Sequence, residues 1–354
     1  MNVLFFWEQV GGLTLQHKCN PYAGLLARAL EKLDIHLELG DYSLSPQWLE
    51  EKRSTHDVLH LNWLHHFYRS TDLESTLERY AHFADRLTLA QRMGYRIVWT
   101  LHNIYPHERP FPHIDHLGRL LVCRLADAIL AHCGHAAELA GRLFHRTDGV
   151  HIIPHGNFID VYPNDMGRDQ ARRQLGLDPD AFVYLFFGNA RAYKGIERLI
   201  EAFERSAPAN AALILMMRQA LDPAYGQSLA ARAQGLAGVH LYTSPYFPVE
   251  DFQLYLNGAD AVVLPFDQIL TSGSAITALG FGRPVVLPRL GCLPELVDDS
   301  MGVLYDPKDR GGLEKAMVQI SQMDTEAAGQ AARARAEELD WDGIAGQIAQ
   351  VYRA

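Results

Sequence analysis

Cysteine is scarce in this sequence. The four residues Cys19, Cys123, Cys133 and Cys292 are scattered, and no two of them form a C-x-x-C pair. This pattern argues against a disulfide framework and is typical of reduced, structural cysteines in a cytosolic protein.

Long apolar runs are also missing. No stretch approaches the roughly 18–20 uninterrupted apolar residues that a membrane-spanning helix needs. The chain opens directly on the apolar segment Val3–Phe6, without the charged and long apolar regions of a signal peptide. We therefore expect a cytoplasmic protein, and contact with the inner face of a membrane at its periphery stays open.

Positive charge is in short supply. Lysine and arginine number 32 against 42 aspartate and glutamate residues, which gives a formal net charge of −10. A nucleic-acid partner is therefore not expected, since such proteins usually carry a basic surface. Arg168, Arg172 and Arg173 form a local basic group, which we interpret as a solvated helix face.

Short apolar runs alternate with amphipathic segments along nearly the whole chain. This alternation predicts an α/β protein with parallel sheets covered on both faces, and 354 residues suit two doubly wound, Rossmann-like domains. We place the domains at residues 1–162 and 163–340, with the C-terminal helix 341–354 packing back on the first. The predicted strands are Val3–Phe6, Val58–Leu61, Ile97–Leu101, Ala128–Ala131, Val150–Ile153, Val183–Phe187, Ala212–Met216, Val239–Tyr242, Ala261–Leu264 and Pro284–Leu287.

Histidine is distributed unevenly, since 16 of the 17 histidines precede residue 156 and only His240 follows. A metal site would explain such a concentration, but the sequence has no H-E-x-x-H motif. The adjacent pair His65 and His66 would point in different directions on a helix or a strand. We expect no metal, and interpret most of these histidines as surface or cleft-lining groups.

The segment from Gly188 to Gly195 carries the strongest chemical signal. A buried strand runs into Gly188 and Asn189, and Arg191 and Lys194 follow just before a new helix. Two cations beside the free N–H groups of a helix start form a site for a dense anion such as a diphosphate. The alternative is a solvated loop whose charges are incidental.

A second turn of this kind follows about eighty residues later. Ser272, Gly273 and Ser274 precede a helix that we expect over Ala275–Leu279. Either serine is suited to cap the helix, and the glycine lets a ligand approach the backbone. Plain capping explains the turn equally well, but two anion-seeking turns in one domain favour a shared ligand.

Taken in order, the motifs resemble those of the GT-B glycosyltransferases, which include many bacterial exopolysaccharide and lipid-linked-sugar transferases. Gly188–Gly195 resembles the G-x-x-R-x-x-K-G donor loop, and Gly291–Pro307 resembles a signature that contains the Pro-Glu pair ending at Glu295. In the first half, Val98–Asn103 resembles the strand that ends in a histidine bordering the donor sugar. Ile152–Phe158 resembles the I-P-x-G turn near the domain junction.

The resemblance implies a nucleotide-sugar site in a cleft between two Rossmann-like domains. Arg191 and Lys194 would stabilise the leaving diphosphate without a divalent metal, and His102 would lie beside the donor sugar. No cofactor is implied, because the nucleotide-sugar is a co-substrate. The donor-binding residues that the resemblance implies are Gly11, Gly12, Gly188, Asn189, Ser272, Gly273, Ser274, Thr277 and Glu295.

One departure from the family pattern concerns the two glutamates of its E-x7-E motif. Alignment puts Ile269 and Thr277 at these positions, and neither side chain is a carboxylate. The stereochemical course therefore stays open, and an inverting enzyme would need a general base. The candidates are His102, Glu108, Glu8 and His65. Glu108 is favoured among them, and the alternative is that Glu108 is an ordinary loop charge without a catalytic role.

The sequence predicts a hexosyltransferase that moves a hexose or related sugar from a UDP- or GDP-linked donor to a saccharide or lipid-linked acceptor. One alternative is a nucleotide-sugar 2-epimerase of the same fold, for which no convincing carboxylate pair is present. Another is a non-catalytic nucleotide-sugar-binding subunit, which the missing glutamates motivate. A monomer and a dimer are both compatible with the sequence.

Overall fold

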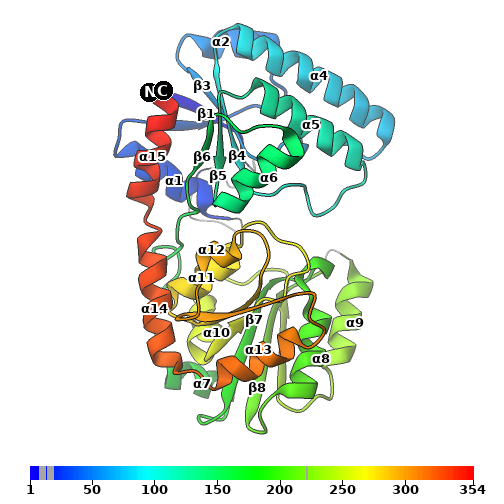
Figure 1. Cartoon of the computed structure of the whole chain (residues 1–354), viewed down its shortest axis with the longest axis vertical. Coiled ribbons are helices and arrows are strands. Elements are labelled where there is room, and N and C mark those ends of the chain that lie inside the picture. Colours follow the sequence, from blue (N-terminus) through cyan, green and yellow to red (C-terminus); the bar gives the residue numbers. More distant parts are fainter. Residues whose placement is uncertain (8–12, 14–19, 221) are drawn as a thin grey trace. The chain divides into compact units, whose positions relative to one another are not determined.

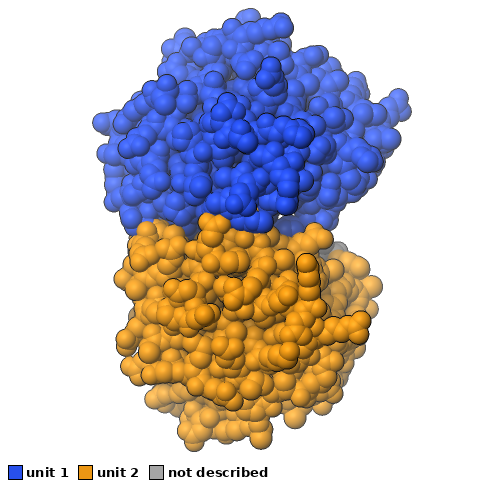
Figure 2. Space-filling view, viewed as in Figure 1, with its two compact units in different colours: residues 1–156, 340–354 blue, residues 157–339 orange. Residues whose placement is uncertain are grey.

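The computed structural model describes residues 1–7, 13, 20–220 and 222–354. The chain divides into two units, coloured separately in Figure 2: unit 1 is Met1–Gly156 with Asp340–Ala354, and unit 2 is Asn157–Leu339. The division comes earlier than the boundary predicted at residue 162. Asn157 already belongs to unit 2 because its backbone N–H donates to the carbonyl of Leu339 over 2.9 Å and its side-chain amide donates to the carbonyl of Ala336 over 2.8 Å.

Unit 1 is built on a six-stranded parallel sheet of order β2-β1-β3-β4-β5-β6 (Figure 1). Its strands are β1 (Asn2–Phe5), β2 (His36–Leu39), β3 (Val58–Leu61), β4 (Arg96–Leu101), β5 (Ala128–Ala131) and β6 (Val150–Ile152). Its helices are α1 (Tyr22–Glu31), α2 (Pro46–Arg53), α3 (His65–Tyr68), α4 (Leu73–Arg92), α5 (Pro112–Leu125), α6 (Gly134–Phe144) and α15 (Trp341–Arg353). Every residue of β3 and β5 is buried, as expected for strands covered on both faces.

Unit 2 repeats this plan with a parallel sheet of order β12-β11-β10-β7-β8-β9. Its strands are β7 (Phe182–Asn189), β8 (Ala211–Arg218), β9 (Val239–Ser244), β10 (Ala261–Val263), β11 (Val285–Pro288) and β12 (Gly302–Tyr305). Its α-helices are α7 (Arg168–Leu175), α8 (Ile196–Ser206), α9 (Pro223–Ala233), α10 (Phe252–Gly258), α11 (Gly273–Gly280), α12 (Leu293–Leu296), α13 (Gly312–Ser321) and α14 (Thr325–Glu338), and two 3₁₀ turns lie at Ala192–Lys194 and Val249–Asp251. The prediction of two doubly wound α/β domains is confirmed.

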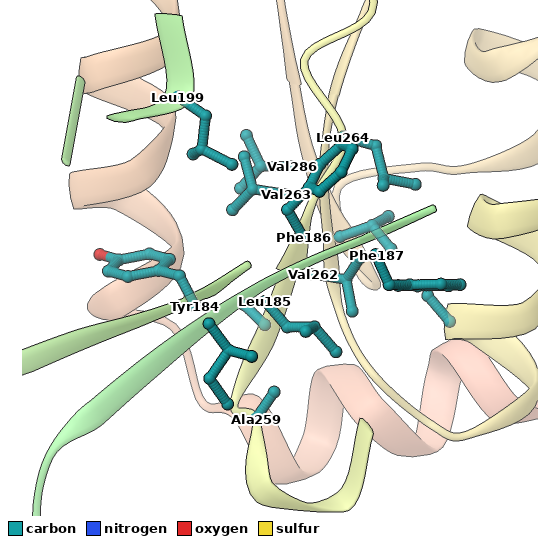
Figure 3. Close-up of a cluster of buried hydrophobic side chains, with 14 of the residues drawn as sticks. Tyr184, Leu185, Phe186, Phe187, Leu199, Ala259, Val262, Val263, Leu264 and Val286 are labelled. Atoms are coloured by element: carbon teal, nitrogen blue, oxygen red, sulfur yellow. The ribbon is translucent and has the colours of Figure 1, made fainter. Parts of the chain in front are cut away.

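The core of unit 2 gathers around the central strand β7. Figure 3 shows Phe186 and Leu185 of this strand among Val262 and Val263 of β10, with Leu199 reaching in from α8. All five side chains are almost completely removed from solvent. Burial of this apolar surface stabilises the sheet that carries the loops at the carboxyl ends of β7 and β10.

The C-terminal helix α15 packs on unit 1. Trp341 lies against Gly156 and packs edge-on to Tyr22, with 5.2 Å between the ring centroids. At the other end of the helix, the hydroxyl of Tyr352 lies 2.5 Å from Nδ1 of His60 on β3. The chain therefore ends in the unit in which it began.

Among the described residues, every helix is too short or too polar to cross a membrane. Cys123 is a free and buried thiol, whereas Cys133 and Cys292 are disulfide-bonded. The expectation of reduced cysteines is therefore wrong for these two residues, and Cys19 lies outside the described residues.

Candidate active site

The loop between β7 and α8 is shaped by two glycines. Gly188 has a φ of +139° and Gly195 a φ of +66°, both in the region that residues with side chains rarely adopt. A Cβ atom on Gly195 would also lie 2.2 Å from the carbonyl oxygen of Pro265. Conformation and space therefore both require glycine at position 195, where the chain turns into α8.

The same loop is tied to the segment that follows β10. The N–H of Asp267 donates to the carbonyl of Tyr193 over 2.8 Å. Arg198 of α8 donates to the carbonyl of Pro265 over 2.7 Å and pairs with the carboxylate of Asp267 at 2.5 Å. Asp267 is the carboxylate nearest in sequence to the missing glutamates, and this ion pair engages it.

Lys194 is a buried cation in this loop. Its side-chain nitrogen lies 4.7 Å from the centre of the Phe266 ring and 3.6 Å from the position that a Cβ on Gly188 would take. Burial, and then the charge of Arg191, lower the pKa of Lys194 to about 8. Among the described residues, no carboxylate lies within 4.0 Å of this ammonium group, so the site favours an incoming anion.

The start of α11 lies beside this cation. Ser272 caps the helix, since its hydroxyl accepts the N–H of Ala275 over 3.1 Å. The hydroxyl of Ser274 lies 3.9 Å from the Cβ position of Gly188, which brings Ser274, Gly188 and Lys194 together. The first amides of a helix have no acceptor within it, so the start of α11 supplies N–H donors next to the ammonium group.

Other predicted donor residues are placed differently. Thr277 is buried and donates its hydroxyl proton to the carbonyl of Gly273 over 2.9 Å, so it serves its own helix. Glu295 is exposed on α12, where its backbone carbonyl accepts a hydrogen bond from Arg335. Asn189 ends β7 and pairs with Arg218 of β8. Gly11 and Gly12 lie outside the described residues, as does Glu8.

His102 follows β4 in unit 1, and both of its ring nitrogens are engaged. Its Nε2 lies 2.8 Å from Oδ1 of Asn62, and its Nδ1 lies 3.2 Å from Nε2 of His132. Burial lowers the pKa of His102 well below its ordinary value, and the neighbouring imidazoles lower it further. A ring held at both nitrogens is poorly suited to take a proton from a substrate hydroxyl, and its place beside the donor sugar stays a prediction.

The other base candidates differ in burial. Glu108 is exposed in the segment between β4 and α5. His65 of α3 stacks on His66 with 4.4 Å between the ring centroids, and burial lowers its pKa to about 3. The role of Glu108 therefore remains a prediction. Among the described residues, no three His, Cys, Asp or Glu side chains are grouped as a metal ion would require.

Two residues around His102 were not singled out as site residues from the sequence. Asn62 follows β3 and His132 follows β5, so both stand at the same edge of the sheet as His102. Their position directly after parallel strands is the signal in the sequence that would have identified them, since ligand sites in such sheets form at the carboxyl ends of the strands.

Comparison with known proteins finds a family model described as Glycosyl transferases group 1 at residues 181–323. The chain is 29% identical over 282 residues to the D-inositol 3-phosphate glycosyltransferase of Xylanimonas cellulosilytica, covering 74% of this chain and 67% of the relative. It is 26% identical over 373 residues to the protein of that name from Streptomyces scabiei, covering 98% and 78%.

Solved structures resemble the whole chain. Sucrose-phosphate synthase from Thermosynechococcus elongatus superposes with a TM-score of 0.75 at 18% identity, covering 99% of this chain and 98% of that one. HepE from Anabaena, solved with UDP and glucose, superposes with a TM-score of 0.74 at 18% identity and the same coverage. At such identities the likeness shows the fold alone.

Proposed function

From the premise that this chain is a group 1 glycosyltransferase of the GT-B fold, we propose that it transfers a hexose from a UDP- or GDP-linked donor. The observation that carries the proposal is the buried ammonium group of Lys194, beside Gly188 and the start of α11. A dense anion such as a diphosphate is the ligand that best matches a desolvated cation next to helix amides.

The diphosphate gains negative charge as the bond from sugar to phosphate breaks. Lys194 and Arg191 stabilise that charge, and the amides of Gly273 and Ser274 add hydrogen bonds to the phosphate oxygens. Because these donors are held in place before the reaction, they stabilise the transition state more than the ground state. The reaction then needs no divalent metal, and activity should persist in EDTA.

The names of similar proteins support a more specific donor and acceptor. HepE was solved with UDP-glucose, which favours a uridine nucleotide here. The curated relatives are named for D-inositol 3-phosphate, a phosphorylated polyol. We propose a hydroxyl-rich acceptor, either a saccharide or a lipid-linked saccharide.

One alternative has an observation in its favour. Thr277 and Ile269 stand where the family carries glutamates, and Asp267 is ion-paired with Arg198, which would fit a protein that binds nucleotide-sugars without turning them over. Release of UDP or GDP from a panel of donors, with and without acceptors, separates the two. Tight binding without nucleotide release would establish the non-catalytic alternative.

The mechanistic test is Lys194→Ala. Loss of a donor to the developing charge should lower kcat by about 10²–10³-fold, with a much smaller effect on donor affinity. Lys308→Ala removes an exposed lysine of the same unit and should leave both quantities unchanged. If Lys194→Ala changed KM alone, the role at the leaving group would be wrong.

A further inference from the structure

A chain of three contacts runs through two imidazole rings at the carboxyl edge of the unit 1 sheet. Oδ1 of Asn62 lies 2.8 Å from Nε2 of His102, and Nδ1 of His102 lies 3.2 Å from Nε2 of His132. Nδ1 of His132 lies 3.0 Å from the carbonyl oxygen of Ile153. Each of the four residues directly follows one of the strands β3, β4, β5 and β6, so the sheet fixes the spacing.

The groups at both ends of this series of contacts, Asn62 and Ile153, present hydrogen-bond acceptors to the rings. The carbonyl of Ile153 has no hydrogen to give. Nδ2 of Asn62 donates to the carbonyl of Phe6 over 3.1 Å, which orients the oxygen of the amide toward His102. The opposite orientation would bring two carbonyl oxygens together, so Oδ1 is the atom that faces the ring.

The rings cannot satisfy all three contacts while both are neutral. A neutral imidazole has one N–H, so two hydrogens are available for three contacts. If His102 donates from Nε2 to Asn62 and His132 donates from Nδ1 to Ile153, the lone pairs of the remaining nitrogens face each other. That contact is the longest of the three, at 3.2 Å. One additional proton would turn it into a hydrogen bond.

The surroundings oppose that proton. Around His102 lie the rings of Tyr22 at 4.9 Å, Trp63 at 4.8 Å and Trp7 at 5.6 Å. Tyr22 and His155 also face His132, at 6.1 and 5.3 Å, and the titratable neighbours of the pair among the described residues are Tyr22, His155 and His60. No carboxylate among the residues with described positions faces either ring. Burial therefore lowers the pKa of His132 to about 4, and the pair is neutral at neutral pH.

We propose that His132 is a positioning residue that acts through His102, and that the two rings take up one shared proton in acid, which stops sugar transfer. The proposal rests on the proposed function and on the prediction from the sequence that His102 lies beside the donor sugar. Cleavage of a bond at the anomeric carbon develops positive charge on the sugar. A positive charge on the pair opposes this development, whereas the neutral pair does not.

The first experiment determines which nitrogen of each ring carries the hydrogen in the unmodified protein. Selective ¹⁵N labelling of histidine at pH 7.5 should show His102 with its hydrogen on Nε2 and His132 with its hydrogen on Nδ1. Their signals should then shift together on acidification, as one coupled titration, at pH values where tryptophan fluorescence still reports a folded unit 1. His240 of unit 2 serves as the internal reference. Two independent titrations, or the opposite tautomer at His132, would overturn the proposal.

Two substitutions should move the titration in opposite directions. Asn62→Asp puts a carboxylate against the N–H of His102, and should raise the pH at which the rate falls by about 1–3 units. In His132→Gln, the introduced amide can donate a hydrogen bond to Nδ1 of His102, which satisfies this contact without an additional proton. The fall in rate should then move to lower pH, with activity retained at pH 7.5.

The pH profiles of the two variants test the histidine pair separately from the proposed sugar transfer. A merely structural role for the two residues predicts that both variants lose activity at every pH, with no displacement of the profile, and that result would overturn the pair. Absence of sugar transfer by the unmodified protein with every donor would instead overturn the proposed function, while the ¹⁵N titration still reports on the pair.

Discussion

At the scale of single residues, burial lowers the pKa of both Lys194 and His102, but the two groups differ in charge at neutral pH. Burial, and then the neighbouring charge of Arg191, lower the pKa of Lys194 to about 8, not far above neutral pH. His102 is surrounded by aromatic rings and neutral imidazoles, and its pKa falls well below its ordinary value. At neutral pH, unit 2 therefore keeps a positive charge at the proposed donor site, while the His102 ring in unit 1 is neutral.

The pKa of Lys194 predicts how binding of the leaving nucleoside diphosphate, which carries the full charge developed in the reaction, depends on pH. The free protein carries the ammonium form below about pH 8 and loses it above, so affinity for a nucleoside diphosphate should fall as pH rises past 8, by up to about tenfold per unit. Titration calorimetry from pH 7 to 9.5 measures the slope. Lys194→Arg should remove the slope, because arginine stays charged throughout. An unchanged slope in that variant would assign the effect to another group.

Much of the proposed donor site follows from the sequence at this scale, because its parts are local. Gly188, Lys194 and Ser274 each stand at a strand-to-helix turn, and such turns bring helix amides and loop cations to one edge of a parallel sheet. The contact between His102 and His132 was not predictable. It depends on the side-chain orientation of residues that follow different strands, and no periodicity of the sequence encodes that orientation.

At the scale of secondary structure, the ten predicted strands are present, and the two that were missed, β2 and β12, are edge strands. The central strands are buried on both faces and appear as continuous apolar runs. β2 alternates exposed and half-buried residues over only four positions, and β12 also has only four residues. The alternation in β2 leaves only a weak apolar signal, whereas β12 is largely buried and begins at Gly302, a residue that is unfavourable in strands.

Two glycines with the same backbone conformation provide a test of the donor loop. Gly176 ends α7 with a φ of +67°, and Gly195 precedes α8 with a φ of +66°. No atom lies within 4 Å of a Cβ built on Gly176, whereas a Cβ on Gly195 meets the Pro265 carbonyl at 2.2 Å. Gly176→Ala should therefore cost only the left-handed penalty, about 1–2 kcal/mol. Gly195→Ala should cost more, since the loop must also move.

Urea unfolding compares the stability of the two variants, and a thermal-shift assay with UDP or GDP compares their donor binding. Only Gly195→Ala should lose the stabilisation that the nucleotide gives the unmodified protein. Equal costs in both variants, with nucleotide binding retained, would show that the tie between this loop and Pro265 is dispensable.

At the scale of the whole molecule, the two units have similar topologies but different ionisable groups. Sixteen of the 17 histidines precede residue 156, so they belong to the part of the sequence that forms unit 1. His60, His132 and His155 are buried there, with pKa values lowered by burial to about 3, 4 and 3. The sequence analysis interpreted most of these histidines as surface or cleft-lining groups. The structure shows that several of them lie in the protein interior.

These buried histidines predict that unit 1 is the acid-sensitive part of the protein. Because their folded-state pKa values are lowered, the unfolded chain binds protons below about pH 6.5 that the folded chain does not bind until much lower pH. Stability is therefore fully present above pH 6.5 and is lost progressively as pH falls toward 3, the folded-state pKa of His60 and His155. With His102 included, four such groups give a slope of up to about 5 kcal/mol per pH unit. Typical stabilities of about 5–15 kcal/mol would be lost within a few pH units.

Tryptophan fluorescence reports this transition selectively, because all five tryptophans, Trp7, Trp48, Trp63, Trp99 and Trp341, belong to unit 1. Fluorescence should change between pH 6 and 4, while amide hydrogen exchange in the strands of unit 2 stays slow over the same range. Asn62→Asp should reduce the slope, because its His102–His132 pair already holds a proton when the chain is folded. If unit 2 lost its protection first, or if both units unfolded in a single transition, the buried histidines would not be what limits stability in acid.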